Sequence, residues 1–180
     1  REKLPKGESN SRDWIHFAVL YSKLVSKLFT GSNKNQTEYF WSAIWPEIDA
    51  AFFNWLEQFY GGLHNLPASP PVMQHHVPKQ LNRYQMKGEK VALILLDGMS
   101  LAGWNTAYSS ISKSLPSDIQ IDCSGVFSWL PSLTPICRQA TYSALTPRLF
   151  EETISRTDRD GSRWKTFWEA NAELRSSQIY

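Results

Sequence analysis

The sequence predicts an α/β fold, a mostly parallel sheet with flanking helices, preceded by a helical segment. Two observations lead to this prediction. Apolar side chains between residues 13 and 62 recur at helical spacing. Residues 91–96 (VALILL) instead form an unbroken apolar run that ends in Asp97-Gly98, a pattern typical of a buried parallel strand. Helix-like and strand-like segments then alternate, which indicates right-handed crossovers.

The first expected helix spans residues 13–28. Its apolar side chains fall on one face, so the helix should be amphipathic. Ser11 or Asp13 can cap its start, and Gly31 can end it. Residues 1–12 are polar and charged, and we interpret them as a linker.

The second expected helix spans residues 37–60 and carries an aromatic stripe that we expect to pack in a core. Pro46 should kink it, and the glycine pair 61–62 should end it. A proline-rich, extended connection follows over 63–86. Residues 87–180 then form the predicted α/β part. The domain prediction is therefore a linker, a helical segment, a connection and a truncated α/β domain.

Within the α/β part, the pattern predicts helices over 99–111 and 166–174, and a loop that enters a helix over 131–144, which Pro147 closes. A second strand is predicted over 119–127 (IQIDCSGVF). Together with the run at 91–96, these segments give the alternation on which the predicted sheet rests.

Composition excludes several classes of protein. Lys and Arg exceed Asp and Glu by only two, so bulk charge does not indicate a nucleic-acid or membrane partner. The aromatic content of 13% excludes a disordered tail. The longest apolar run is too short to span a membrane. Cys123 and Cys137 form no metal-type spacing and no disulfide framework, so we expect a cytoplasmic protein. Because residue 1 is Arg, we also expect a piece of a longer chain.

Asp97 is the first candidate functional residue. Ligands in open α/β sheets bind outside the carboxyl ends of the strands, and Asp97 follows the predicted strand directly. A carboxylate there can hold a metal ion or act in acid–base chemistry, and Gly98 allows a sharp turn beside it.

Thr134 is the second candidate. It stands where the predicted helix through Arg138 begins. A hydroxyl at a helix N-terminus lies beside free backbone donors that stabilise an anion, and coordination to a metal can activate it as a nucleophile. The alternative is that Thr134 only caps the helix, and the residues taken by themselves favour that alternative.

Two segments resemble a known family. VALILLDGMS and SWLPSLTPICRQATYSALTP resemble the opening of the alkaline phosphatase superfamily, and specifically its PglZ branch. The shared pattern is a strand-end Asp, then Pro-x-x-Thr/Ser, then a small-residue segment ending in proline, here SALTP at 143–147. The upstream stretch AFFNWLEQFYGGLHNLP is similar to PglZ proteins of type 3 BREX phage-resistance systems. The resemblance covers roughly residues 50–175.

The resemblance implies roles for particular residues. Asp97 corresponds to the first metal-ligating aspartate, and Thr134 to a nucleophile that also touches the metal. Arg138 follows Thr134 by one helical turn, and from this spacing we infer a phosphate contact. Cys137 stands where phosphodiesterase relatives have an asparagine that contacts the oxyanion.

The resemblance also implies cofactors and partners. The family uses two divalent cations, zinc being the expected metal, and nothing in this sequence matches the downstream ligands. We therefore expect this chain by itself to be inactive. The implied function is phosphoester or phosphodiester hydrolysis in phage defence. Other BREX proteins are the expected partners, DNA is a further candidate, and no membrane is expected.

Two alternatives stay open. The chain can be a non-catalytic interaction component of a defence complex, or another α/β enzyme such as a phosphoglycerate mutase-like protein. A sulfatase is disfavoured because Thr134 cannot become formylglycine.

Several other residues carry weaker expectations. Adjacent histidines at 75–76 point apart in extended chain, which favours a structural role, and Trp129 should pack its loop. Four aspartates are expected to be solvated, and four basic residues could flank a polyanion: Asp118, Asp122, Asp158 and Asp160, and Lys87, Lys90, Arg138 and Arg148.

Overall fold

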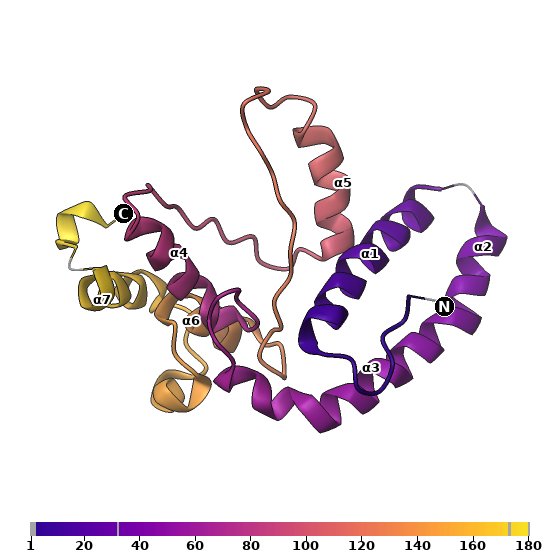
Figure 1. Cartoon of the computed structure of the whole chain (residues 1–180), viewed down its shortest axis with the longest axis horizontal. Coiled ribbons are helices and arrows are strands. Elements are labelled where there is room, and N and C mark those ends of the chain that lie inside the picture. Colours follow the sequence, from indigo (N-terminus) through magenta and orange to yellow (C-terminus); the bar gives the residue numbers. More distant parts are fainter. Residues whose placement is uncertain (1–2, 32, 173, 180) are drawn as a thin grey trace. The chain divides into compact units, whose positions relative to one another are not determined.

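The protein consists of two compact units. The structure is a computed structural model that describes residues 3–31, 33–172 and 174–179. Unit 1 combines Arg1–Gly62 with Leu96–Gly125, and unit 2 combines Leu63–Leu95 with Val126–Tyr180. Figure 1 shows that both units are built from helices joined by irregular chain.

The first predicted helix is present as α1 (Ser11–Thr30). Its cap is Asn10 rather than Ser11 or Asp13, since the Asn10 side chain accepts from the backbone N–H groups of Arg12 and Asp13. The Asp13 carboxylate accepts from the Asn10 N–H in return, which completes a capping box. Gly31 ends the helix, as predicted, with its N–H donating to the Lys27 carbonyl.

The second predicted helix is divided. It begins as α2 (Lys34–Tyr39), passes through a π-helical turn (Phe40–Ile44), and continues as α3 (Trp45–Phe59). The predicted disturbance at Pro46 takes the form of this π-helical turn. Proline has no N–H to donate to the preceding turn, and the neighbouring Trp45 N–H bonds the carbonyl five residues back, on Phe40.

The predicted end of that helix is confirmed in position, because α3 ends at Phe59 and Tyr60 follows as its capping residue, directly before the glycine pair. After α3 the backbone tightens into a 3₁₀ turn over Tyr60–Asn65, which contains both glycines. Neither glycine has a positive φ, so neither forms the left-handed cap that the sequence suggested.

In unit 1, α1 packs along α5 (Leu101–Ile111), which lies beside it in Figure 1, and contacts α3 through aromatic side chains. The predicted helix at 99–111 is confirmed by α5. Trp14 and Trp55 are both almost fully buried, with ring centroids 5.9 Å apart. On the other side of α1, Asn105 donates to the Ser22 hydroxyl at 2.7 Å. The aromatic stripe therefore packs in a core only in part: Phe40 and Trp55 are buried, whereas Trp41, Trp45 and Phe59 are exposed.

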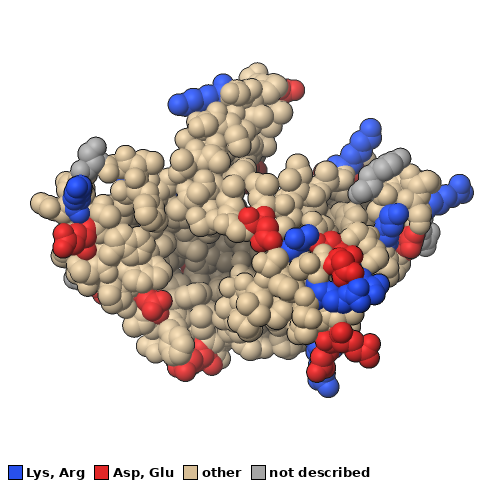
Figure 2. Space-filling view, turned by 180° about the vertical axis from the view of Figure 1, so that it is seen from behind, with Lys and Arg blue, Asp and Glu red and all other residues tan. Residues whose placement is uncertain are grey.

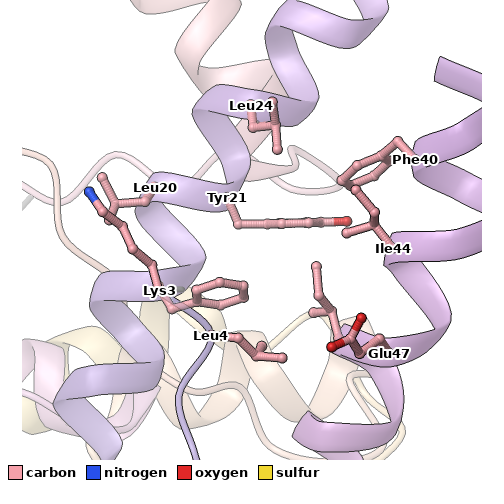
Figure 3. A pocket seen from close by; sticks show the side chains of 10 residues that line it. Lys3, Leu4, Leu20, Tyr21, Leu24, Phe40, Ile44 and Glu47 are labelled. Atoms are coloured by element: carbon pink, nitrogen blue, oxygen red, sulfur yellow. The ribbon is translucent and has the colours of Figure 1, made fainter. Parts of the chain in front are cut away.

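A hollow of about 460 Å³ opens between α1 and the segment that carries the π-helical turn. Figure 3 shows the Tyr21 ring extending across it toward Phe40 and Ile44. The Tyr21 hydroxyl is buried and finds no hydrogen-bond partner among the described residues, and burial raises the pKa of Tyr21 to about 12. Unit 1 thus carries an uncompensated buried hydroxyl.

Unit 2 contains the helices α4, α6 and α7. They are accompanied by shorter 3₁₀ turns, and α6 packs against α7. The helix predicted within 131–144 is confirmed by α6, whereas the one at 166–174 begins six residues earlier, as α7. The sequence missed α4 because prolines dominate its surroundings, yet Pro78 occupies the first turn, where a helix tolerates it. The helices are α4 (Val77–Gln85), α6 (Thr134–Ser143) and α7 (Asp160–Ala172). The 3₁₀ turns span Gln74–His76, Pro147–Thr153 and Ser176–Gln178.

The core of unit 2 has an apolar and a polar part. Phe167 and Trp168 of α7 belong to the buried apolar cluster. Beside it, the Gln139 side chain is fully buried and donates to the Thr153 carbonyl at 2.7 Å. The Gln139 Oε1 atom accepts from Thr153 and from Arg163, so this buried amide is hydrogen-bonded at both ends.

The predicted parallel sheet is wrong. Helical elements hold 62% of the described residues, and none of the described residues forms a strand. The segments 91–96 and 119–126 have no regular secondary structure, and among the residues that the structure describes a single isolated parallel bridge forms, between Met73 and Phe127. A strand needs a partner for its backbone N–H and C=O groups. The apolar run lacks such a ladder, and Ile94 is 83% exposed.

Candidate functional site

Thr134 is the first residue of α6, and its side chain is exposed. The position that precedes the helix and would cap it is held by Leu133, whose side chain makes no capping hydrogen bond. Within the described part of the chain, the Thr134 hydroxyl makes no hydrogen bond either. Thr134 is therefore not the helix cap that the residues by themselves favoured.

The start of α6 is suited to holding an anion next to this hydroxyl. The first N–H groups of an α-helix have no partner inside the helix, and the aligned peptide dipoles place partial positive charge there. Pro135 follows Thr134 and has no N–H, and the first intrahelical bond runs from Cys137 to the Leu133 carbonyl at 3.0 Å.

Arg138 lies one turn after Thr134 on α6, and its guanidinium group binds a carboxylate. Its Nε atom donates to Asp160 Oδ2 at 2.8 Å, and its Nη2 atom donates to the same oxygen. The expectation that Asp160 is solvated is wrong, because only 14% of its side chain is exposed. Asp158 is largely exposed, as expected, although the Arg156 guanidinium lowers the pKa of that carboxyl to about 2.

Asp97 ends the apolar run and is exposed. Gly98 after it has φ of +70°, the left-handed conformation that glycine adopts without strain, so the predicted sharp turn is confirmed. Asp97 belongs to unit 1, whereas Thr134 and Arg138 belong to unit 2.

Two buried histidines lie near Trp129 in unit 2. His75 and His76 are each 2% exposed, with ring centroids 4.2 Å apart, and the His75 ring lies 5.2 Å from that of Trp129. Burial, and then the charges of His76 and Lys79, lower the pKa of His75 to about 4. The predicted packing role of Trp129 is confirmed. The adjacent histidines do not point apart, because the chain forms a 3₁₀ turn there.

The chemistry of Asp97 and Thr134 suits a divalent cation, since both offer oxygen atoms. In the described ranges, however, no three His, Cys, Asp or Glu side chains gather around one point where a metal could sit. Cys123 and Cys137 do not form a disulfide with each other.

The charged side chains of one face can be followed in Figure 2. Figure 2 shows basic and acidic side chains mixed in small groups on the face that it draws. Lys87, Lys90 and Arg148, expected to flank a polyanion, are exposed. No membrane-spanning stretch was found when the helices of the described part were searched.

Comparison with known families decides the relationship. The family model of the BREX system PglZ alkaline phosphatase-like domain matches residues 72–172, more than half of the chain. The chain belongs to the PglZ family. The match includes Asp97, Thr134 and Arg138. No curated protein and no solved structure matches the chain. Membership of this PglZ family indicates a phosphatase-like role in phage defence.

The structure also reveals polar residues that the sequence analysis did not single out. Arg159 and Arg163 lie at the start of α7, and Gln139 joins Arg163 to Thr153. The sequence does show that the two arginines are four residues apart, the spacing of neighbours on one helix face. It does not show the hydrogen bond between Gln139 and Thr153, because that bond joins segments separated by a turn.

Proposed function

We propose that this chain forms part of a metal-dependent phosphoester or phosphodiester hydrolase of phage defence, with Thr134 as nucleophile and Asp97 as a metal ligand. One observation carries the proposal. Within the segment matched by the PglZ family, Thr134 presents an exposed hydroxyl at the first residue of α6, unused by capping. A nucleophile requires such access.

In the proposed reaction, Thr134 loses its hydroxyl proton to solvent and its Oγ1 atom forms a bond to phosphorus, while the bond to the leaving ester oxygen breaks and that oxygen takes up a proton from solvent. Water then attacks phosphorus, the bond to Thr134 Oγ1 breaks, and Oγ1 regains a proton. The product is phosphate from a monoester substrate and a phosphomonoester from a diester. The backbone N–H groups at the start of α6 stabilise the charged phosphate oxygens during both steps. A cation bound by Asp97 and Thr134 would lower the pKa of the hydroxyl.

Arg138 is proposed as a phosphate contact. Its guanidinium group donates to Asp160, so a phosphate group would compete with that carboxylate for Arg138. Such competition is chemically reasonable, since guanidinium groups bind both anions in a similar geometry. Asp160 then positions Arg138 while the site is empty of substrate.

The proposed cofactors and partners follow from the family. We propose two divalent cations, zinc being our choice of metal, with ligands beyond the two residues named here. The proposed partners are other BREX proteins, and DNA is the proposed polymeric substrate.

The test measures hydrolysis of a phosphomonoester and a phosphodiester by the complete protein that carries this sequence. Assays contain Zn²⁺, Mn²⁺ or a chelator. We expect metal-dependent turnover that falls by about a thousandfold or more in Thr134→Ala, because removal of a nucleophile abolishes its pathway. Ser132→Ala, which removes an exposed hydroxyl two residues earlier, should leave turnover unchanged.

Equal turnover in wild type and Thr134→Ala would exclude Thr134 as nucleophile. If the folded, metal-loaded protein hydrolyses neither substrate, the enzyme proposal fails and the interaction role in a defence complex takes its place. The better of the two substrates separates a phosphatase from a phosphodiesterase.

A further inference from the structure

The start of α7 carries more arginines than the neighbouring carboxylates neutralise. Asp160 accepts from Arg138, and Asp158 accepts from Arg156. Two further arginines lie in the same stretch, Arg159 and Arg163, and neither has an acidic partner within ion-pair distance in residues 3–31, 33–172 and 174–179. Both carboxylates are thus ion-paired with other arginines, and Arg159 and Arg163 are attracted to Asp158 and Asp160, respectively, only over longer distances.

These two arginines face the same hollow. Arg159 immediately precedes α7, and the Arg163 N–H donates to the Arg159 carbonyl at 2.9 Å, so the two residues are one helical turn apart. Both line a hollow of about 470 Å³ in unit 2, together with Ser162 and Thr166. A volume of this size lies within the roughly 300–1,000 Å³ of typical ligand sites.

Arg163 is held in place by uncharged groups. Its Nε atom donates to Gln139 Oε1 at 3.0 Å, and its Nη2 atom donates to the Thr153 hydroxyl at 2.6 Å. Its guanidinium carbon also lies 5.0 Å from the centre of the Phe150 ring. These contacts fix the position of the guanidinium group, but none of them is an ion pair. Burial, and then the charge of Arg159, lower the pKa of Arg163.

Hydrogen bonds fix the Arg163 guanidinium group, and Arg159 lies one helical turn away. Because neither arginine forms an ion pair with another described residue, the two groups together favour the binding of an anion between them. An anion relieves the repulsion of Arg159 and Arg163 and offsets the partial desolvation of Arg163. A phosphate group suits the pair better than a carboxylate does, because it offers more acceptor oxygens and up to two negative charges.

We propose that Arg159 and Arg163 form a binding site for a phosphate group, separate from Thr134. Thr134 does not line this hollow. The site therefore goes beyond the proposed hydrolase function: it holds a phosphate without cleaving it. The phosphate comes either from a free phosphate or small phosphate ester, or from the backbone of a nucleic-acid strand.

The test is calorimetric titration of the full chain with inorganic phosphate, with ionic strength held constant by chloride. We expect saturable binding that Arg159→Gln weakens by roughly tenfold or more, because one of two charge-assisted contacts is lost. Arg156→Gln is the matched control: Arg156 is also exposed and adjacent, but its charge is already paired with Asp158. It should change the affinity by less than about twofold.

The proposal would be overturned if the folded wild-type chain showed no saturable phosphate binding. It would also be overturned if Arg159→Gln and Arg156→Gln lost equal amounts of phosphate affinity. Circular dichroism verifies that each variant is folded. Thr134→Ala should bind phosphate at this site as the wild type does, so failure of the hydrolase proposal and failure of this one are distinguishable.

A second titration identifies the source of the phosphate. If a nucleic-acid strand supplies it, a short single-stranded oligonucleotide binds more tightly than inorganic phosphate. The salt dependence of oligonucleotide affinity then shows that Arg159→Gln lowers the number of counterions released on binding by about one. If the oligonucleotide binds no more tightly than inorganic phosphate, the site takes a free phosphate or a small ester.

Discussion

Acidification should destabilise unit 2 through His75. This side chain is 2% exposed, and its ring lies against those of His76 and Trp129. The His76 Nδ1 atom accepts from the backbone N–H groups of Val72 and Met73 at 3.2 and 3.3 Å, so that nitrogen carries no proton. Protonation would therefore place charge in a buried cluster built around neutral rings.

The magnitude follows from the pKa of His75, which lies at about 4 in the folded protein against an ordinary value of 6.5. Because the pKa is lower in the folded state, the unfolded chain binds more protons between these two values. The free energy of unfolding is then constant above pH 6.5 and falls as pH drops toward 4. At about 1.36 kcal/mol for each pKa unit, the full loss is about 3 kcal/mol, of which about 2 kcal/mol is lost by about pH 5.

Urea unfolding at pH 7.5 and pH 5.0 measures this loss, with circular dichroism and tryptophan fluorescence as probes. His75→Gln removes the titrating group, so the difference between the two pH values should shrink by about 2 kcal/mol. His76, whose pKa is also lowered by burial, should account for a remaining difference. The comparison uses the change with pH, so a uniform destabilisation of the variant does not affect it.

His16→Gln is the matched control, because His16 is exposed on α1 of unit 1. It should lose as much stability between the two pH values as the wild type. If His75→Gln also keeps the full loss, the reasoning from His75 is refuted.

Two further substitutions test the packing of each unit. Tyr21→Phe should stabilise the protein by about 1 kcal/mol, because it removes a buried hydroxyl that has no partner among the described residues; a lower melting temperature would show that the hydroxyl is satisfied in solution. Gln139→Ala should destabilise it by about 2–4 kcal/mol, since Thr153 and Arg163 lose the atom that they share. Chemical unfolding measures this loss, and a change below about 0.5 kcal/mol would mean that the network contributes little.

Helix patterns were the most predictable part of the fold. The amphipathic spacing before Gly31 and the helix at 99–111 depend on interactions between residues three or four apart, and both were found. The parallel sheet was not, because an apolar run such as 91–96 specifies extended backbone but not the second strand that must pair with it. Pro78 likewise suggested a break where it actually opens α4.

The candidate site likewise has features that were predictable from the sequence and features that were not. The position of Thr134 at a helix start was predictable from its flanking prolines and the apolar spacing after it. That Leu133 rather than Thr134 occupies the capping position was not, since the two differ by one residue and helix ends are the least regular part of the pattern. The binding of Asp160 by Arg138 joins two helices, and no local spacing reports it.

The interleaved course of the chain has a consequence for how the protein is made. Unit 1 consists of Arg1–Gly62 and Leu96–Gly125, and its second piece separates the two pieces of unit 2, Leu63–Leu95 and Val126–Tyr180. During synthesis, α1 emerges from the ribosome first, and the first segment of unit 2 emerges before α5. The contact between α1 and α5 can therefore form only after that segment has been made. No single cut in the sequence releases an intact unit. Truncations ending between residues 62 and 100 keep α3 but lack α5, so they should expose the face of α1 that α5 covers, around Ser22, and should aggregate.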